Sequence, residues 1–241
     1  MLEYARQMDV IRKVQDGLDI HTATAEMMGV ERKPAKTLNF MLLYGGGVVK
    51  LAMALFPVKL GENELWAMWR EHNEWKFEPG DEAILKRLTV NDWEENLPWL
   101  LEAQRLKNLY FEKLPMVESW VDRVKAAAKE RGFVRDWTGR ELYCKVKRFS
   151  YKMPNAIIQG GCSSVAKHAL IQLDSFLQGK KSKPLVQVHD EILFKVHRDE
   201  LDIVPNLKNI MENVFPYQHL KLTCSVSHSW ESWGKLVDGA P

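Results

Sequence analysis

The sequence predicts an α+β fold, in which helices come first and a small antiparallel sheet comes later. Apolar residues recur at helical spacing up to Lys129. A Thr138-Gly139 turn signal within residues 132–143 is typical of a β-hairpin. Residues 185–197 then form two short apolar runs that alternate in the manner of strands. At 241 residues, the chain is expected to form one large domain or two unequal ones.

Capping residues and glycines divide the first part of the chain. Helices are expected over residues 2–16, 19–28 and 32–44. Asp19 can cap the second helix, and Gly29 can close it. The third should begin near Arg32, because Pro34 is tolerated only in a first turn. It should end at the three glycines 45–47.

The remaining elements follow the same signals. Residues 48–129 are expected to be mostly helical, with interruptions around Pro79-Gly80 and Pro98. After the hairpin, the expected elements are a helix over 153–177, two strands over 185–197 joined by a turn at 189–191, an amphipathic helix within 200–215 and a strand over 222–226. Pro205 should delay the regular part of the amphipathic helix.

Composition excludes several classes of protein. With 46% hydrophobic and 27% charged residues, the chain is globular and not disordered. It has no apolar run long enough for a membrane span, and its charged beginning is unlike a signal peptide. Three cysteines cannot all pair, which favours a reduced, cytoplasmic location. No membrane partner is expected.

Charge is distributed unevenly along the chain. Residues 62–104 contain eleven acidic and four basic side chains, a net charge of −7, so the remainder carries +9. A polyanion would be repelled by the acidic stretch and attracted by the rest. Five of the nine tryptophans also lie in this stretch, which indicates a segment packed against a folded body.

The first group of candidate functional residues is spaced every four positions: Arg32, Lys36, Phe40 and Tyr44. On a helix, this spacing places them along one stripe, with the cations at the N-terminal end, where the helix dipole also favours an anion. The aromatic rings could pack on a sugar or base. The stripe fits a nucleoside triphosphate. The alternative is a half-solvated helix with snorkelling cations and core-facing Phe40 and Tyr44.

The second group is the turn His189-Asp190-Glu191 between two apolar strands. Carboxylates held on a rigid support are suitable ligands for Mg²⁺. Two such ions can clamp the attacking and leaving oxygens of a phosphoryl transfer. A merely solvated acidic turn is the alternative.

Together, these groups resemble a known family. Arg32-x3-Lys36-x7-Tyr44-Gly45 resembles motif B of family A DNA polymerases, and residues 185–191 resemble their motif C. Three further segments also fit the pattern of this family, in the same order: residues 19–25, Gly139-Arg140 and Asn155-x3-Gln159-Gly160. The resemblance covers nearly the whole chain and is weakest over 62–104. Related single-subunit RNA polymerases usually carry Met at the position of Phe40, which favours a DNA polymerase.

The resemblance implies a role for each matching residue. Asp190 would bind the catalytic Mg²⁺ ions, with Glu191 assisting. His21, Arg32 and Lys36 would hold the triphosphate of a dNTP, and Lys36 would protonate the leaving pyrophosphate. Phe40 would stack on the sugar, and Tyr44 and Gly45 would guard the templating site. The residues expected to contact the DNA primer-template are Arg140, Asn155, Gln159 and His189.

The resemblance also implies two domains. Residues 1–150 would form the fingers, including a palm-side helix at 1–16 and the acidic, Trp-rich insertion 62–104. Residues 151–241 would form the C-terminal palm with the motif C hairpin.

The sequence departs from the family in one important respect: motif A, whose aspartate supplies the second metal-binding carboxylate, is absent, as are the thumb and the first part of the palm. One carboxylate cluster cannot readily hold two hydrated Mg²⁺ ions. We therefore expect that the isolated chain does not extend a primer. It would be the C-terminal piece of a split, phage-type polymerase completed by a second polypeptide. The alternative is a non-catalytic, DNA-binding remnant.

Two smaller features lie near residue 150. Tyr151 stands where many relatives have an arginine that touches the primer. The basic cluster Lys145, Lys147, Arg148 and Lys152 either follows a phosphate backbone or forms an ordinary solvated face.

Overall fold

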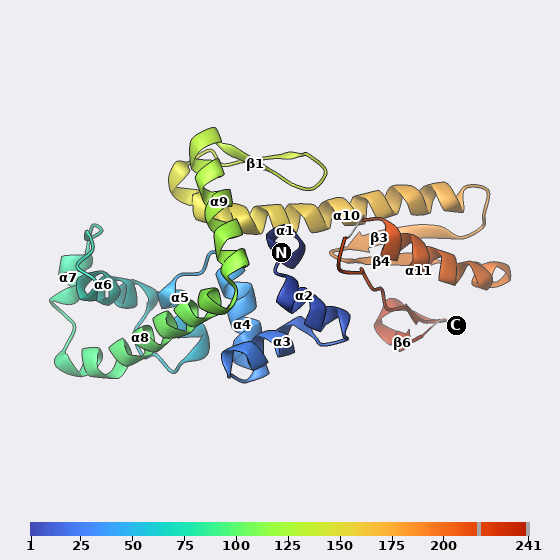
Figure 1. The fold of residues 1–241 in the computed structure, drawn as a ribbon. Helices are drawn as coiled ribbons and strands as arrows, with labels where there is room; N and C mark the ends of the chain where they lie inside the picture. The colour runs from blue at the N-terminus through green and yellow to red at the C-terminus, as the bar shows by residue number, and fades with distance from the viewer. Residues whose placement is uncertain (216–217, 240–241) are drawn as a thin grey trace. The chain divides into compact units, whose positions relative to one another are not determined.

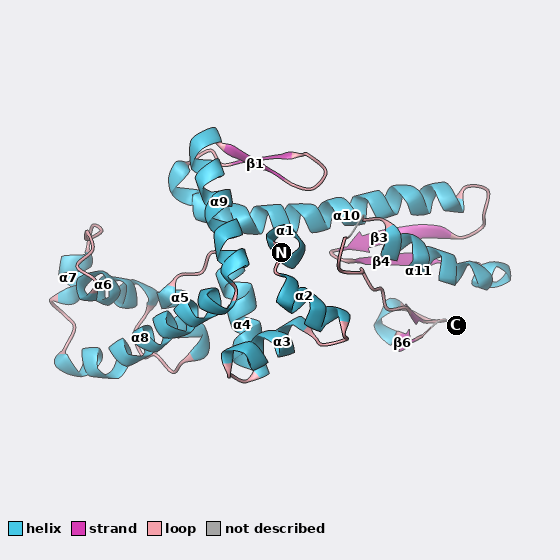
Figure 2. Ribbon diagram, viewed as in Figure 1, coloured by secondary structure: helices cyan, strands magenta, loops and turns pink. Residues whose placement is uncertain are grey.

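The computed structural model describes residues 1–215 and 218–239, apart from the side chains of Glu3 and Trp233. The chain divides into two compact units (Figure 1). The first comprises Met1–Gly132 and Cys144–Asn155, and the second comprises Phe133–Tyr143 and Ala156–Pro241. Helices dominate the first unit and the paired strands belong to the second (Figure 2), so the predicted α+β class is confirmed.

Nine α-helices and one 3₁₀-helix make up the described elements of the first unit. They are α1 Leu2–Ala5, α2 Met8–Gln15, α3 Ile20–Met28, α4 Arg32–Leu43, α5 Val48–Leu55, α6 Glu62–His72, α7 Asp81–Leu85, α8 Val90–Lys113, α9 Pro115–Arg131 and η1 Lys147–Lys152. Their amphipathic faces meet in a core whose fully buried members include Ile11, Leu38, Leu51, Leu65 and Leu100.

The helix expected over residues 2–16 is broken in two. Arg6 has a φ of 55°, which separates α1 from α2. The break allows Gln7 to become buried and to accept a hydrogen bond from the Met116 N–H at 3.1 Å. That N–H belongs to the first turn of α9, where backbone donors have no partner within the helix. A tertiary hydrogen bond therefore explains the interruption.

The helices α3 and α4 have the predicted ends. Asp19 accepts the Thr22 N–H at 3.1 Å as the N-cap of α3, and Gly29 closes α3 with a left-handed φ of 65°. The two helices pack through small and apolar side chains, including the fully buried Ala23, Ala35 and Leu38.

The interruption expected at Pro98 is wrong, because α8 continues through it. A proline inside a helix costs about 3 kcal/mol. Here the flanking residues offset that cost: Asn96 and Leu100 are fully buried, and the Asn96 side chain accepts the Lys59 N–H at 2.8 Å. The predicted interruption at Pro79-Gly80 is confirmed, since α7 starts only at Asp81.

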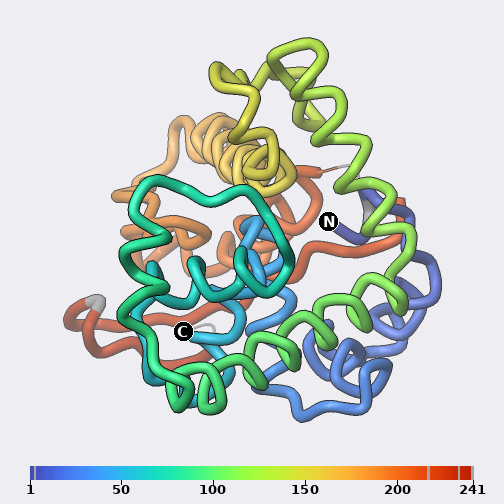
Figure 3. The backbone as a smooth tube through the Cα atoms, turned by 90° about the vertical axis from the view of Figure 1, so that its left-hand side faces the viewer, coloured from blue at the N-terminus to red at the C-terminus, as the bar shows by residue number. Residues whose placement is uncertain are grey.

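The second unit is built on a long helix. Its elements are β1 Phe133–Arg135, β2 Glu141–Tyr143, α10 Met153–Leu177 (from Ala156 onward), β3 Lys183–Val188, β4 Glu191–Lys195, η2 Arg198–Ile203, α11 Val204–Asn213, β5 Ser227–His228, η3 Trp233–Lys235 and β6 Val237–Asp238. Figure 3 looks along the length of α10. Both predicted hairpins are present as antiparallel pairs, β1–β2 and β3–β4.

The β3–β4 hairpin is anchored from one side. Ile192 and Phe194 pack against a cluster that includes Leu173 of α10 and Leu207 of α11. Period-two alternation along β4 therefore places its apolar side chains on the helices. This packing gives the turn at the end of the hairpin a fixed support.

The strand expected over 222–226 is wrong. Those residues lie outside any strand, and the pairing begins only at β5, where Ser227 pairs with Asp238 of β6. The Cys224 N–H donates at 2.9 Å to the Glu212 carboxylate of α11. A side chain thus takes the donor that a β-ladder would need.

No helix in the described part of the chain is both long enough and apolar enough to cross a membrane.

Candidate functional site

Helix α4 presents the predicted stripe to solvent. Phe40 and Tyr44 are 43% and 46% exposed, and their rings stack with centroids 6.2 Å apart and planes 11° apart. The buried side of the helix carries Ala35, Leu38 and Leu42 instead. The interpretation in which both rings face the core is therefore wrong.

Two cations lie at the N-terminal part of this stripe. The Arg32 guanidinium contacts the Asp19 carboxylate, with its Nε 3.0 Å and one Nη 2.9 Å from the same oxygen. Lys36 is exposed one turn further along. Because the first turn of a helix also offers unpaired N–H groups, this end of α4 favours an anion.

His21 of α3 lies beside the stripe. Its ring is 5.4 Å from that of Phe40, and its Nδ1 is 3.1 Å from the Asn39 amide nitrogen. Partial burial lowers the pKa of His21; the nearby Asp19 carboxylate raises it, and Arg32 and Lys36 lower it, so that the net shift is downward. The structure thus brings His21, Arg32, Lys36, Phe40 and Tyr44 to one surface of α3 and α4.

Asn39 is the residue that sequence reasoning missed. It is 4% exposed and contacts His21, Thr24 and Tyr110. Its position on the core side of an otherwise apolar helix face was the available signal, because a buried amide requires hydrogen-bond partners.

Gly45 forms a tight turn after α4. It has a φ of 73°, and a Cβ built there would lie 2.8 Å from the Tyr151 ring and 2.9 Å from the Tyr151 carbonyl oxygen. Only glycine fits both the left-handed backbone and this close approach. Tyr151 therefore lies directly against the end of the stripe.

The carboxylate turn lies in the second unit. Val188 pairs with Glu191 across the hairpin, so the turn consists of His189 and Asp190 alone, one residue shorter than expected. His189 has a left-handed φ of 53°, and its carbonyl accepts the Gln187 amide at 3.1 Å. Asp190 and Glu191 are exposed.

The other predicted DNA contacts lie along α10 and the first hairpin. Arg140 holds the hairpin to α10, since its guanidinium contacts the buried Asp136 carboxylate at 3.2 Å and donates to the Gly160 carbonyl at 3.0 Å. Gln159 is exposed on α10, and Asn155 is half-buried near its start.

The carboxylates fit the chemistry of Mg²⁺, but the set is incomplete. Hard carboxylate oxygens are its usual protein ligands, and Asp190 and Glu191 supply two adjacent groups. The described residues contain no cluster of three or more His, Cys, Asp or Glu side chains that could hold a metal ion.

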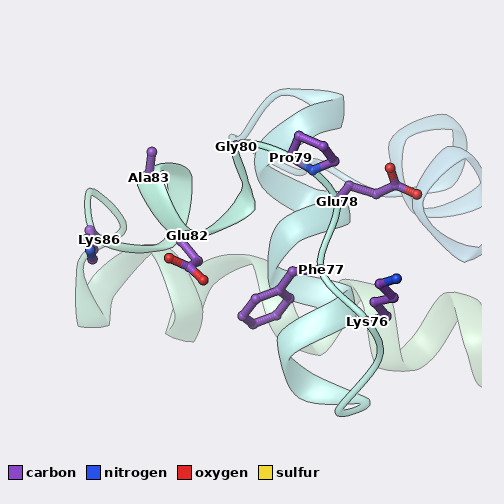
Figure 4. A pocket seen from close by; sticks show the side chains of 8 residues that line it. All are labelled: Lys76, Phe77, Glu78, Pro79, Gly80, Glu82, Ala83 and Lys86. Atoms are coloured by element: carbon purple, nitrogen blue, oxygen red, sulfur yellow. The ribbon is translucent and has the colours of Figure 1, made fainter.

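A hollow of about 840 Å³ lies elsewhere, in the segment around α7 (Figure 4). It is lined by Lys76, Phe77, Glu78, Pro79, Gly80, Glu82, Ala83 and Lys86. Its two lysines balance its two glutamates, and none of the predicted site residues lines it.

The fold of this chain also occurs in a solved structure. This chain is similar to the structure described as the POL domain of Pol1 from M. smegmatis in complex with DNA primer-template and dNTP. The TM-score is 0.66 at 21% identity, over 92% of this chain and 35% of that one. The chain thus shares its fold with part of that structure.

Sequence comparison gives the family. The sequence model of DNA polymerase family A matches residues 100–235, more than half of the 241 residues. The chain therefore belongs to DNA polymerase family A.

Curated relatives agree with this assignment. Thermostable DNA polymerase I of Thermus aquaticus is 27% identical over 93% of this chain and 24% of its own length. DNA polymerase I of Pseudomonas aeruginosa is 27% identical over 85% of this chain and 20% of its own length. The chain thus spans about a quarter of the length of these relatives, or less.

Proposed function

We propose that this chain carries out template-directed DNA synthesis, transferring a nucleotide from a dNTP to a primer 3′-OH, as the C-terminal piece of a split family A polymerase. The observation that carries the proposal is the exposed stripe of α4, with two cations at its anion-favouring end and two stacked rings at the other.

The triphosphate lies at the cationic end. Arg32 offers planar guanidinium donors, and Lys36 offers a compact charge one turn further on. His21 adds a third group from α3. Lys36 protonates the leaving pyrophosphate, Phe40 stacks on the sugar, and Tyr44 and Gly45 guard the templating site.

The metal-binding end is the carboxylate turn. Asp190 binds Mg²⁺, and Glu191 assists. When bound, Mg²⁺ neutralises charge on the phosphates and activates the attacking oxygen. The described residues hold no group of three or more His, Cys, Asp or Glu side chains that could bind a metal ion. In this proposal, a second polypeptide carrying motif A, the N-terminal part of the palm and the thumb completes the site.

The remaining assignments follow the same scheme. Residues 1–150 form the fingers, and residues 151–241 form the C-terminal palm with the motif C hairpin. Arg140, Asn155, Gln159 and His189 contact the primer-template. The acidic 62–104 insertion faces away from DNA, toward the partner, and the protein is of phage type.

Primer extension in a reconstituted complex tests the proposal. The chain is mixed with candidate partners that carry a motif A aspartate. Asp190→Asn and Lys36→Ala each abolish extension while leaving the circular dichroism spectrum unchanged. The matched controls Asp202→Asn and Lys129→Ala alter exposed residues of the same type and leave extension intact. Full activity of Asp190→Asn would reject the assigned chemistry.

A second candidate is a non-catalytic DNA-binding remnant. It is favoured by the basic and aromatic character of η1, where Arg148 and Lys152 lie 4.9 and 4.7 Å from the centre of the Phe149 ring. It predicts salt-dependent affinity for primer-template DNA that requires no triphosphate and is unaffected by Asp190→Ala.

A further inference from the structure

A small polar cluster is buried beneath the stripe of α4. Thr24 of α3, Asn39 of α4 and Tyr110 of α8 are 2%, 4% and 1% exposed. Asn39 contacts both others and also His21, which is only half-buried. The cluster therefore connects the inside of the first unit with a group on its candidate nucleotide-binding surface.

The partners fix the orientation of the Asn39 amide. Thr24 donates its hydroxyl proton to the Ile20 carbonyl at 2.8 Å, so its oxygen can accept the Asn39 amide N–H at 3.0 Å. The Tyr110 hydroxyl lies 3.0 Å from the Asn39 amide oxygen and donates to it. Rotating the amide by 180° would leave the buried Tyr110 proton facing an N–H group and would bring two acceptor oxygens together at Thr24.

This orientation determines the state of His21. The Asn39 amide nitrogen lies 3.1 Å from Nδ1 of His21. Since that amide nitrogen can only donate, Nδ1 must accept, and it does so only when it carries no proton. A neutral imidazole then has its proton on Nε2.

We propose that Asn39 is a positioning residue that holds His21 as the neutral tautomer with its proton on Nε2. Asn39 thereby makes His21 a hydrogen-bond donor for a phosphate oxygen beside Arg32 and Lys36. In the other tautomer, a bare Nε2 lone pair would repel that oxygen. That the donor serves a dNTP phosphate rests on the proposed function, whereas the tautomer itself does not.

The surroundings favour the neutral ring. Arg32 and Lys36 from α4 place positive charge near His21, and a second proton would oppose the Asn39 amide N–H. Asp19, at the start of α3, is the acidic group that favours a charged ring, but it is engaged by Arg32 at 2.9 Å. From α8, the Tyr110 hydroxyl donates to the Asn39 amide oxygen and adds no charge beside the ring. The lowered pKa of His21 agrees with this balance, in which partial burial contributes most.

Nitrogen-15 NMR of the histidine rings tests the tautomer in the full chain, with no ligand present. His21 is assigned from the spectrum of His21→Gln. We expect the His21 proton on Nε2 at neutral pH. His168 is an internal control that should have the other tautomer. Its Nδ1 lies 2.7 Å from the Ser164 carbonyl oxygen and must carry a proton to donate to it. A proton on Nδ1 of His21 in the wild type would overturn the proposal.

Two variants separate positioning from simple packing. Tyr110→Phe removes one of the two hydroxyls that orient the Asn39 amide and leaves only the weaker preference set by Thr24. We expect His21 to become a mixture of tautomers while the chain stays folded. Asn39→Asp replaces the donor with an acceptor, moves the proton to Nδ1 and raises the pKa of His21 by at least about one pH unit. An unchanged His21 tautomer in folded Tyr110→Phe would reject the mechanism, even if Asn39→Asp fails to fold.

Binding of inorganic tripolyphosphate, measured by calorimetry, separates this inference from the proposed function. We expect Tyr110→Phe to weaken binding severalfold and His21→Gln to weaken it at least as much. If the wild-type chain has the Nε2–H tautomer but binds no tripolyphosphate, Asn39 has the positioning role and the nucleotide-binding assignment fails. If tripolyphosphate binds equally well to the wild type and to Tyr110→Phe with mixed tautomers, the stated purpose of the tautomer is wrong.

Discussion

Arg32 and Asp19 form a contact in which two guanidinium nitrogens, Nε at 3.0 Å and one Nη at 2.9 Å, approach a single carboxylate oxygen. The same oxygen accepts the Thr22 N–H at 3.1 Å. Asp19 therefore caps α3 and also holds the first residue of α4. The ion pair is exposed and contributes less than about 1 kcal/mol, whereas the cap contributes about 1 kcal/mol.

Substitution of Asp19 should separate these two contributions. We expect Asp19→Ala to lower the free energy of unfolding by about 1 kcal/mol, because α3 loses its cap. Asp19→Asn keeps a capping side chain and should lower the free energy of unfolding by only about a few tenths of a kcal/mol. Urea unfolding measures both. An equal loss in the two variants would show that the charge on Asp19 matters more than its role as a cap.

Replacing Gly45 with alanine should lower the stability of the folded chain. Gly45→Ala places a methyl group 2.8 Å from the Tyr151 ring on a backbone with a φ of 73°. Gly29→Ala is the matched control, because its φ of 65° is similar but nothing lies within 4 Å of the added Cβ. The left-handed backbone alone costs about 1 kcal/mol, and we expect Gly45→Ala to exceed this by a further ~1 kcal/mol or more in urea unfolding. Equal losses at the two positions would contradict the close approach to Tyr151.

The acidic 62–104 segment should depend on one internal ion pair. Arg70 of α6 donates two hydrogen bonds of 2.6 Å to Asp81 of α7, and these side chains are 17% and 3% exposed. The Arg70 hydrogen bonds hold the pKa of Asp81 below its usual range, against the opposing effect of burial. Asp81→Asn should cost about 3–5 kcal/mol, because it leaves a nearly buried guanidinium without its counter-ion.

The exposed pair between Lys59 and Glu95 provides the control for that measurement. Breaking it with Glu95→Gln should change the free energy of unfolding by less than about 1 kcal/mol. If Asp81→Asn lowers the free energy of unfolding as little as Glu95→Gln does, the stability of the 62–104 segment does not depend on the Arg70–Asp81 pair.

Lowering the pH should destabilise the second unit, because the Glu200 carboxylate becomes protonated. Its carboxylate accepts the Ser182 hydroxyl and the N–H groups of Lys181 and Ser182, and these hydrogen bonds, with that of the hydroxyl the largest, lower the pKa of Glu200 from 4.5 to about 2. Because the folded-state pKa is depressed, the stabilisation is complete above the unfolded value of 4.5. It is lost as the pH falls toward about 2.

Unfolding midpoints of the wild type and of Glu200→Gln, measured from about pH 5 to about pH 2, test this expectation. The variant should be less stable at the upper end, and its midpoint should fall less across the range. Glu130→Gln, on the exposed side of α9, should follow the wild type. A Glu200→Gln profile parallel to that of the wild type would contradict the assignment.

Local signals predicted much of the fold. The ends of α3 and α4 follow from the Asp19 cap and from glycines at Gly29 and Gly45, because these act within one turn of the chain. The errors have tertiary causes. Gln7 breaks the first helix to reach α9, Asn96 helps α8 to continue through Pro98, and Glu212 takes a donor from the expected last strand.

In the candidate site, too, some features could be predicted from the sequence and others could not. The four-residue spacing from Arg32 to Tyr44 predicted one stripe, because helix geometry alone decides it. Asn39 was not predicted, because its role depends on Tyr110, which is 71 residues away in the sequence. A spacing pattern cannot show which distant side chain will meet a buried amide.

Primer extension by three preparations tests the central claim most directly: the chain alone, a motif A partner alone, and their mixture with primer-template, dNTPs and Mg²⁺. We expect extension only in the mixture, and none when the chain carries Asp190→Asn. Extension by the purified chain without any partner, or by the mixture regardless of Asp190, would contradict the proposed function.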